Sequence, residues 1–183
     1  QLAQLLDGNI KVKSVVGQGS VFQLTLPVSI PTDAEVPIKT PVKSVIGLAP
    51  DQPIYRILVV EDSAENRLLL VQLLLLVGFE VREAENGREA ILQWERWHPH
   101  LIFMDMRMPI VDGYEATKQI KASPQGKETV IIALTASVFD EKQAAMMAAG
   151  CSDWLQKPFR EEELFTTVAQ HLGVRYLYAE DRE

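Results

Sequence analysis

From residue 56 to residue 172, short and mainly apolar runs alternate with longer segments of helical periodicity. The short runs are residues 57–60, 80–84, 101–104, 130–134 and 153–156, and the helical segments are residues 64–77, 87–97, 113–121, 139–149 and 161–172. Short apolar runs bounded by Gly, Pro or Asp are typical of strands buried on both faces. Five successive strand–helix units predict an α/β domain, a doubly wound five-stranded parallel sheet with five helices.

The strand order expected for this pattern is 2-1-3-4-5, the flavodoxin-like arrangement, with its switch point between the first and third strands. Open α/β sheets place their chemistry at the carboxyl ends of the strands near that point. The third strand ends in Asp105, and a loop with Pro109 and Asp112-Gly113 follows. Asp105 is therefore a candidate functional residue, although an isolated aspartate here would most often only cap a turn.

The first 53 residues lack this alternation. Residues 1–28 combine a short amphipathic helix with a hairpin of residues 10–16 and 20–26, and such a hairpin is marginal on its own. Residues 29–53 contain five prolines and no sustained periodicity, which indicates a linker without an assigned strand. The expected parts are a domain fragment at 1–28, a linker at 29–53, the α/β domain at 54–173 and a tail at 174–183.

Composition excludes several classes of function. The net charge of −7 argues against a nucleic-acid-binding surface. The longest apolar run, residues 68–77, is well short of the ~20 residues that span a bilayer, so we expect no membrane contact by this chain. The single cysteine, Cys151, excludes an internal disulfide and fits a reducing compartment. With an initial Gln and no signal-peptide pattern, the chain is expected to be a piece of a longer cytoplasmic one.

Acidic residues end two strands that the expected order makes neighbours. Glu61 and Asp62 follow the first strand, and Asp105 ends the third. Like charges about 4 Å apart repel by roughly 4 kcal/mol at an effective dielectric constant of 20, so the cluster favours a bound cation over a solvated acidic rim. Carboxylate oxygens without nearby His or Cys favour Mg²⁺, with Mn²⁺ as an alternative, over zinc.

Two further polar residues end strands at the same edge. Thr135 ends the fourth strand, and Lys157 follows the fifth. A hydroxyl and an ammonium suit a phosphoryl group, whose oxygens need hydrogen-bond donors and positive charge. Singly, Thr135 would be a helix N-cap and Lys157 a surface lysine. Together with a carboxylate nucleophile and a metal site, they predict an acyl phosphate on Asp105.

Residues 56–172 resemble the receiver domain of two-component response regulators. The matching positions are Glu61, Asp62, Asp105 within MDMRMP, Thr135 within ALTA and Lys157 within KPF. The resemblance implies that Asp105 accepts phosphate from a phosphohistidine. It also implies that Asp62, Asp105 and the backbone carbonyl of Arg107 hold Mg²⁺, with Glu61 acting through water. Lys157 would contact the phosphate or Asp105, and a cis Lys157-Pro158 bond is expected.

The same resemblance implies a conformational switch. Thr135 would move toward the phosphate, and Trp154 would rotate as the aromatic residue of the last strand. Tyr or Phe is more usual there, so switching and simple packing both remain open for Trp154. Arg107 and Ser137 would face the attacking water and set the phosphate lifetime. The surplus leucines of the first helix indicate either a docking patch for a helical phosphodonor or an over-packed core.

Residues 8–27 resemble the closing strands of the ATP-binding domain of sensor histidine kinases. The matching residues are Gly17, Gly19, Ser20, Phe22, Leu26 and Pro27. Because the upstream ATP-site segments are missing, the only catalysis expected is the chain's own aspartyl phosphorylation and dephosphorylation. The two resemblances together imply that the chain is the C-terminal part of a hybrid sensor histidine kinase. Its partners would be a histidine phosphotransfer protein or the kinase core, in cis or in trans. The alternative is a non-phosphorylated interaction module of receiver fold, which the complete set of site residues disfavours.

Overall fold

The computed structural model describes residues 8–17, 19–27, 44–136 and 140–179. The chain falls into two units, residues 1–41 and residues 42–183. Within the described residues, no helix has both the length and the apolar character needed to cross a membrane. The amphipathic segment at residues 1–7, Ser137 and most of the expected linker lie outside the described residues.

The first unit is the expected hairpin. Strands β1 (Asn9–Val15) and β2 (Gly19–Thr25) pair antiparallel around the turn at Gly17. The pairs Ile10↔Leu24 and Val12↔Phe22 share one face because side chains alternate along a strand. All four of these apolar side chains are more than half exposed, so this face has no core of its own among the described residues.

The second unit contains the predicted parallel sheet. Its strands are β4 (Arg56–Val60), β5 (Glu80–Ala84), β6 (Leu101–Asp105), β7 (Val130–Thr135) and β8 (Asp153–Gln156). They lie in the order β5-β4-β6-β7-β8, and every pairing is parallel. Counted within the domain, this is the order 2-1-3-4-5, so the fold prediction is confirmed.

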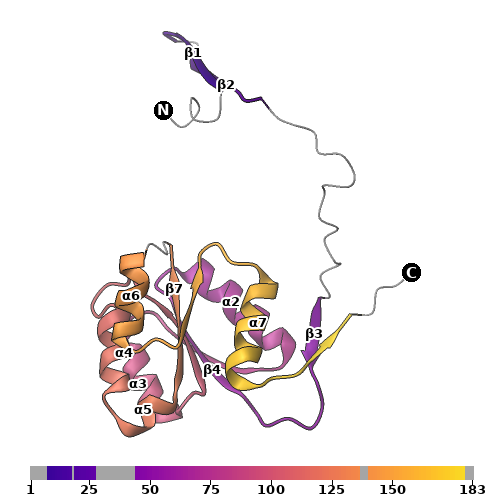
Figure 1. Cartoon of the computed structure of the whole chain (residues 1–183), viewed down its shortest axis with the longest axis vertical. Helices are drawn as coiled ribbons and strands as arrows, with labels where there is room; N and C mark the ends of the chain where they lie inside the picture. Colours follow the sequence, from indigo (N-terminus) through magenta and orange to yellow (C-terminus); the bar gives the residue numbers. More distant parts are fainter. Residues whose placement is uncertain (1–7, 18, 28–43, 137–139, 180–183) are drawn as a thin grey trace. The chain divides into compact units, whose positions relative to one another are not determined.

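Helices cover both faces of this sheet (Figure 1). They are α2 (Ala64–Val77), α3 (Gly87–Trp97), α4 (Gly113–Lys121), α5 (Pro124–Glu128), α6 (Asp140–Ala149) and α7 (Glu161–Leu172). Alternate residues of β4 enter opposite cores: Ile57 and Val59 pack with α2 and α7, and Leu58 and Val60 pack with α3 and α4. All four are fully buried, as a strand covered on both faces requires.

The described residues form six helices in this unit, one more than expected. The addition is α5, whose five residues are too few to produce amphipathic periodicity. Its local signals are a Ser123 N-cap that accepts a hydrogen bond from Gly126 N–H at 2.9 Å and Pro124 in the first turn.

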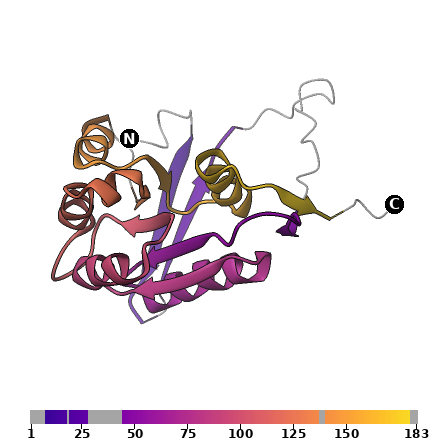
Figure 2. The ribbon, with the colours of Figure 1, turned by 90° about the horizontal axis from the view of Figure 1, so that it is seen from below.

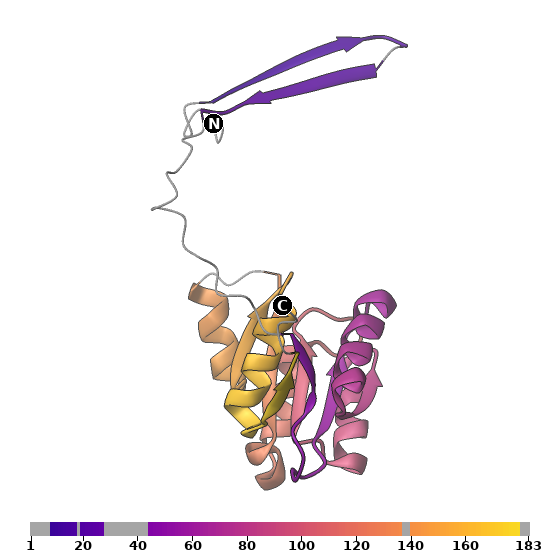
Figure 3. The ribbon, with the colours of Figure 1, turned by 90° about the vertical axis from the view of Figure 1, so that its right-hand side faces the viewer.

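A second small sheet joins segments for which the sequence predicts a linker and a tail. Strand β3 (Val45–Leu48) pairs antiparallel with β9 (Tyr176–Tyr178), as Figures 2 and 3 show in purple and yellow. Val45, Leu48 and Tyr176 pack against the α2/α7 core. The linker expectation is therefore wrong at residues 45–48. Strands of four and three residues leave too short a pattern to be recognised, and their partners are distant in sequence.

Candidate functional site

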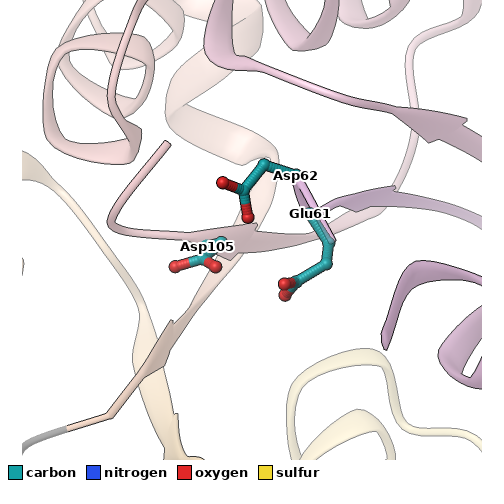
Figure 4. A group of neighbouring side chains, drawn as sticks. All are labelled: Glu61, Asp62 and Asp105. Atoms are coloured by element: carbon teal, nitrogen blue, oxygen red, sulfur yellow. The ribbon is translucent and has the colours of Figure 1, made fainter. Parts of the chain in front are cut away.

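Three carboxylates meet at the carboxyl edge of the sheet (Figure 4). Glu61 and Asp62 follow β4, and the parallel register Val60↔Met104 places Asp105, the last residue of β6, beside them. One carboxylate oxygen from each residue lies within 4.8 Å of the others. Glu61 and Asp105 are buried, and Asp62 is exposed. The predicted acidic cluster is therefore formed.

The β6–α4 loop holds Asp105 in place through its backbone. The Arg107 N–H donates a hydrogen bond to Asp105 Oδ1 at 2.9 Å. Gly113, the first residue of α4, lies so close that an added Cβ would stand 2.2 Å from the Asp105 carbonyl oxygen. Only glycine fits there, so Gly113 lets the loop turn tightly behind Asp105.

Lys157 links the two buried carboxylates. Its Nζ donates to Asp105 Oδ2 at 2.7 Å and also to Glu61 Oε2. The backbone N–H of Lys157 donates to the Thr135 carbonyl at 2.7 Å, and the Lys157-Pro158 peptide bond is cis, as expected. Burial alone would lower the pKa of Lys157, but hydrogen bonds and charges from Asp105 and Glu61 outweigh it and raise the pKa. Lys157 is therefore a fixed positive charge.

Thr135 and Trp154 come from the two strands beyond β6. Thr135 is buried at the end of β7, in the strand whose Leu134 pairs with Asp105. Trp154 lies on β8 opposite Ala133 and packs against the α3/α4 core as a partly buried side chain. In this conformation Trp154 therefore acts as a packing residue.

Two site-forming residues were missed by the sequence reasoning. Asn66 Nδ2 donates to Glu61 Oε1 at 3.3 Å, and the buried Arg67 Nη1 donates to the Glu61 carbonyl at 2.8 Å. Arg67 also forms ion pairs with Glu85 at 2.8 Å and Glu83 at 3.4 Å. A signal was present: Arg67 occupies a core-facing position of α2, where an arginine needs several partners.

A cavity of about 360 Å³ opens next to the Lys157–Glu61 pair. Its walls combine leucines of α2 with the β8–α7 connection, and they are Asn66, Leu69, Leu70, Leu73, Leu134, Pro158, Phe159 and Glu161, together with the ion pair itself. The cavity therefore joins an apolar groove to the charged site.

The charge distribution suits a divalent cation. Three carboxylates face one ammonium, which leaves uncompensated negative charge at the edge. Oxygen ligands within this separation, one of them exposed, fit a small hard cation that keeps some of its water. Among the residues that the structure describes, Glu61, Asp62 and Asp105 form a group able to hold a metal.

Comparison with known proteins identifies the same region. The model of the response regulator receiver domain matches residues 57–169. The sensor protein EvgS of Escherichia coli K12 is 30% identical over 188 residues, covering 96% of this chain but 15% of EvgS. This chain thus spans a small part of that relative.

Solved structures of receiver domains are similar to this chain over the same region. The receiver domain of the sensor histidine kinase PA1611 from Pseudomonas aeruginosa, with magnesium coordinated in its active site cleft, has a TM-score of 0.62 and 35% identity, covering 66% of this chain and 99% of that one. The receiver domain of Saccharomyces cerevisiae Ssk1, solved with the histidine phosphotransfer protein Ypd1, has a TM-score of 0.61 and 31% identity, covering 64% and 88%. The sheet order, the acidic cluster at its carboxyl edge and the matching family model all lead to the same conclusion. This chain belongs to the response regulator receiver domain family.

Proposed function

We propose that Asp105 is the phosphoacceptor of this receiver domain in a two-component phosphorelay. The observation that carries the proposal is the convergence of Glu61, Asp62, Asp105 and Lys157 at one sheet edge. Phosphoryl transfer requires a nucleophile, a metal ion and positive charge near the phosphoryl oxygens. A carboxylate beside an acid pair suited to a metal and a fixed ammonium can meet these requirements.

The reaction follows from these groups. One carboxylate oxygen of Asp105 attacks the phosphorus of a phosphohistidine, and the P–N bond breaks. Its electron pair returns to the imidazole, which takes a proton from solvent. Lys157 then balances the charge of the phosphoryl oxygens. Water later cleaves the acyl phosphate, releasing inorganic phosphate and restoring the Asp105 carboxylate.

Mg²⁺ is the proposed cofactor, and Mn²⁺ would also fit. Asp62, Asp105 and the Arg107 backbone carbonyl are its proposed ligands, with Glu61 acting through water. The bound cation would neutralise charge on the phosphoryl group during transfer. Asn66 and Arg67 support this set by holding the Glu61 side chain and carbonyl, respectively.

Phosphorylation is proposed to shift the conformation through Thr135 and Trp154. The Thr135 hydroxyl would become a hydrogen-bond donor to the phosphoryl group from the end of β7. Trp154 would then leave its present packing and turn inward. Arg107, two residues after Asp105, is proposed to influence the attack of water on the acyl phosphate.

The proposed partners are histidine-bearing helices of a phosphotransfer protein or of a histidine kinase core. The groove beside Lys157 and Glu61 offers apolar walls next to the reacting carboxylate, which suits such a helix. We further propose that the chain is part of a cytoplasmic hybrid kinase region. Residues 1–28 would belong to its ATP-binding domain, because the exposed apolar hairpin face needs a core.

Incubation with acetyl phosphate and Mg²⁺, followed by intact-mass measurement, tests the phosphoacceptor proposal. We expect a mass gain of one phosphoryl group in the native chain. The gain should be absent without Mg²⁺ and absent in Asp105→Asn, which keeps the side-chain shape but removes the nucleophilic charge. Asp112→Asn, a change at an aspartate that caps α4, is the matched control and should still be phosphorylated.

A phosphorylated histidine phosphotransfer protein provides the second donor. Uptake from this donor alone would restrict the proposal to protein donors. No uptake from either donor would overturn it and favour a docking module of receiver fold.

A further inference from the structure

The outward face of α2 carries four exposed leucines, which we call the outer leucine stripe. They are Leu68, Leu69, Leu75 and Leu76, with exposures of 55%, 61%, 51% and 79%. Other residues on the inner face of α2, including Leu70 and Leu74, are buried and pack in the core. The over-packed-core interpretation is therefore wrong for the stripe. Large apolar side chains exposed together on one helix face indicate an interaction site.

The stripe is symmetric about one exposed polar residue, Gln72. Leu68 and Leu76 lie four residues to either side of it, and Leu69 and Leu75 lie three residues to either side. At 3.6 residues per turn, these pairs stand at about 40° and about 60° on opposite sides of Gln72. A second helix that runs antiparallel, related by a two-fold axis passing between the two Gln72 residues, therefore places its leucines at the heights of the first helix's leucines.

We propose that the outer leucine stripe binds a second copy of this chain, with the two α2 helices antiparallel. Leu68 and Leu69 of one copy then lie at the same height along the helices as Leu76 and Leu75 of the other, so each leucine pair meets a leucine pair. The Gln72 amides meet on the axis, where each can donate to and accept from the other. The antiparallel arrangement also sets the two helix dipoles in opposition, which favours it over the parallel one.

The position of the stripe separates this partner from a phosphodonor. α2 begins beside the acidic cluster and runs away from it. Leu76 is twelve residues into the helix from Ala64, or about 18 Å along its axis. A phosphodonor must bring its histidine to Asp105, so it covers the first turns and the groove. Only Leu69 belongs to both surfaces. The distal leucines need another partner.

No charge interrupts the stripe. Between Leu68 and Leu76 the exposed positions hold only leucine and Gln72, and the one acidic residue on this face, Glu65, lies beyond its end. In a symmetric dimer the same leucines of both copies are buried in one interface. A single helix of 14 residues is a short contact, so the dimer should be reversible and dependent on concentration.

Sedimentation velocity of the full chain over a concentration series tests the proposal. We expect a reversible monomer–dimer equilibrium, weakened at least about tenfold by Leu76→Glu, because that change buries a charge at the contact. Leu92→Glu on α3, where the leucine is 45% exposed, is the matched control and should leave the equilibrium unchanged. Phosphoryl uptake by Leu76→Glu, together with its circular dichroism, checks that the variant is folded.

Association through the β1–β2 hairpin is the alternative that a control must exclude. Phe22 is 73% exposed on the apolar face of the β1–β2 hairpin, which can also associate. Association lost in Phe22→Glu but retained in Leu76→Glu would overturn the proposal. A native chain that stays monomeric throughout the series would do the same.

Engineered cysteines report the orientation. Gln72→Cys should form an intermolecular disulfide under mild oxidation because the residue faces itself across the axis. A mixture of Leu68→Cys and Leu76→Cys should cross-link, whereas Leu68→Cys alone should not, since eight residues separate its two copies by about 12 Å along the helices. Glu95→Cys on α3 is the exposed control. Efficient cross-linking of Leu68→Cys with itself would contradict the antiparallel arrangement.

Discussion

At the scale of single residues, the site depends on close backbone packing as much as on its charged side chains. Glu61, Asp62, Asp105 and Lys157 could be placed from the sequence because each follows a recognisable strand. Gly113 could be recognised there only as part of an Asp-Gly turn. Its necessity becomes visible only when the Asp105 carbonyl is seen behind it.

Gly113→Ala should therefore damage both stability and phosphorylation. The new methyl group would stand 2.2 Å from the Asp105 carbonyl oxygen, so the β6–α4 loop must move. Overpacking of this kind costs about 1–3 kcal/mol, measurable as a fall in the free energy of unfolding in urea. Gly47→Ala is the control, because the nearest atom to its added Cβ is 3.8 Å away. Equal stability of the two variants would contradict the expectation.

His100 should make stability depend on pH. Its Nδ1 accepts a hydrogen bond from Arg56 N–H at 2.9 Å, which requires the neutral imidazole. Burial, and secondarily the charge of Arg56, lower the pKa of His100 below its ordinary value of 6.5. The unfolded chain therefore binds the proton first, and the free energy of unfolding should fall as the pH drops below 6.5.

Urea unfolding at several pH values measures this effect against His100→Asn. The asparagine keeps a side-chain acceptor but does not titrate. We expect the difference in unfolding free energy between the native chain and the variant to shrink as the pH falls below 6.5. A difference that stays constant with pH would show that His100 does not carry the dependence.

At the scale of elements, the strongest local patterns were interpreted correctly and the weakest were not. A helix follows each of the five strands of the large sheet, and this regular alternation predicts a parallel sheet. β3 and β9 have no such context: four and three residues pair across more than a hundred others. Their pairing is decided by what they cover, namely the α2/α7 core.

Tyr176 tests whether this small sheet stabilises the domain. Its ring contacts Phe165 at 5.4 Å and Phe79 at 6.3 Å between centroids. Tyr176→Ala should lower the free energy of unfolding by about 1.5–3 kcal/mol, the value of burying a large apolar side chain. Tyr178→Ala, at the half-exposed end of the same strand, should cost much less.

The hydroxyl of Tyr176 separates packing from hydrogen bonding. It is buried and has no hydrogen-bond partner among the described residues. Tyr176→Phe should therefore be neutral or stabilising by up to about 1 kcal/mol, because an unsatisfied buried group is removed. A clear loss of stability in Tyr176→Phe would show that the hydroxyl has a partner.

At the scale of the whole molecule, folding concentrates negative charge that the unfolded chain keeps apart. Mg²⁺ should therefore bind the folded domain in preference and stabilise it. At about 100 times its dissociation constant the gain is about 2.7 kcal/mol, which thermal unfolding would register as a higher Tm. Asp62→Asn should reduce the gain, while Asp153→Asn, remote from the cluster, should not. Equal stabilisation of both variants would place the cation elsewhere.

The sequence by itself determined the parallel sheet, its strand order and the acidic and basic residues at its edge. Those features depend on periodicity and on the rule that parallel strands end together, and both are local or topological. Only the tertiary structure decided that Arg67 supports Glu61, that β3 pairs with β9, and that the surplus leucines of α2 lie outside the core. Each of these depends on which distant groups come into contact, and such contacts exist only after the chain has folded.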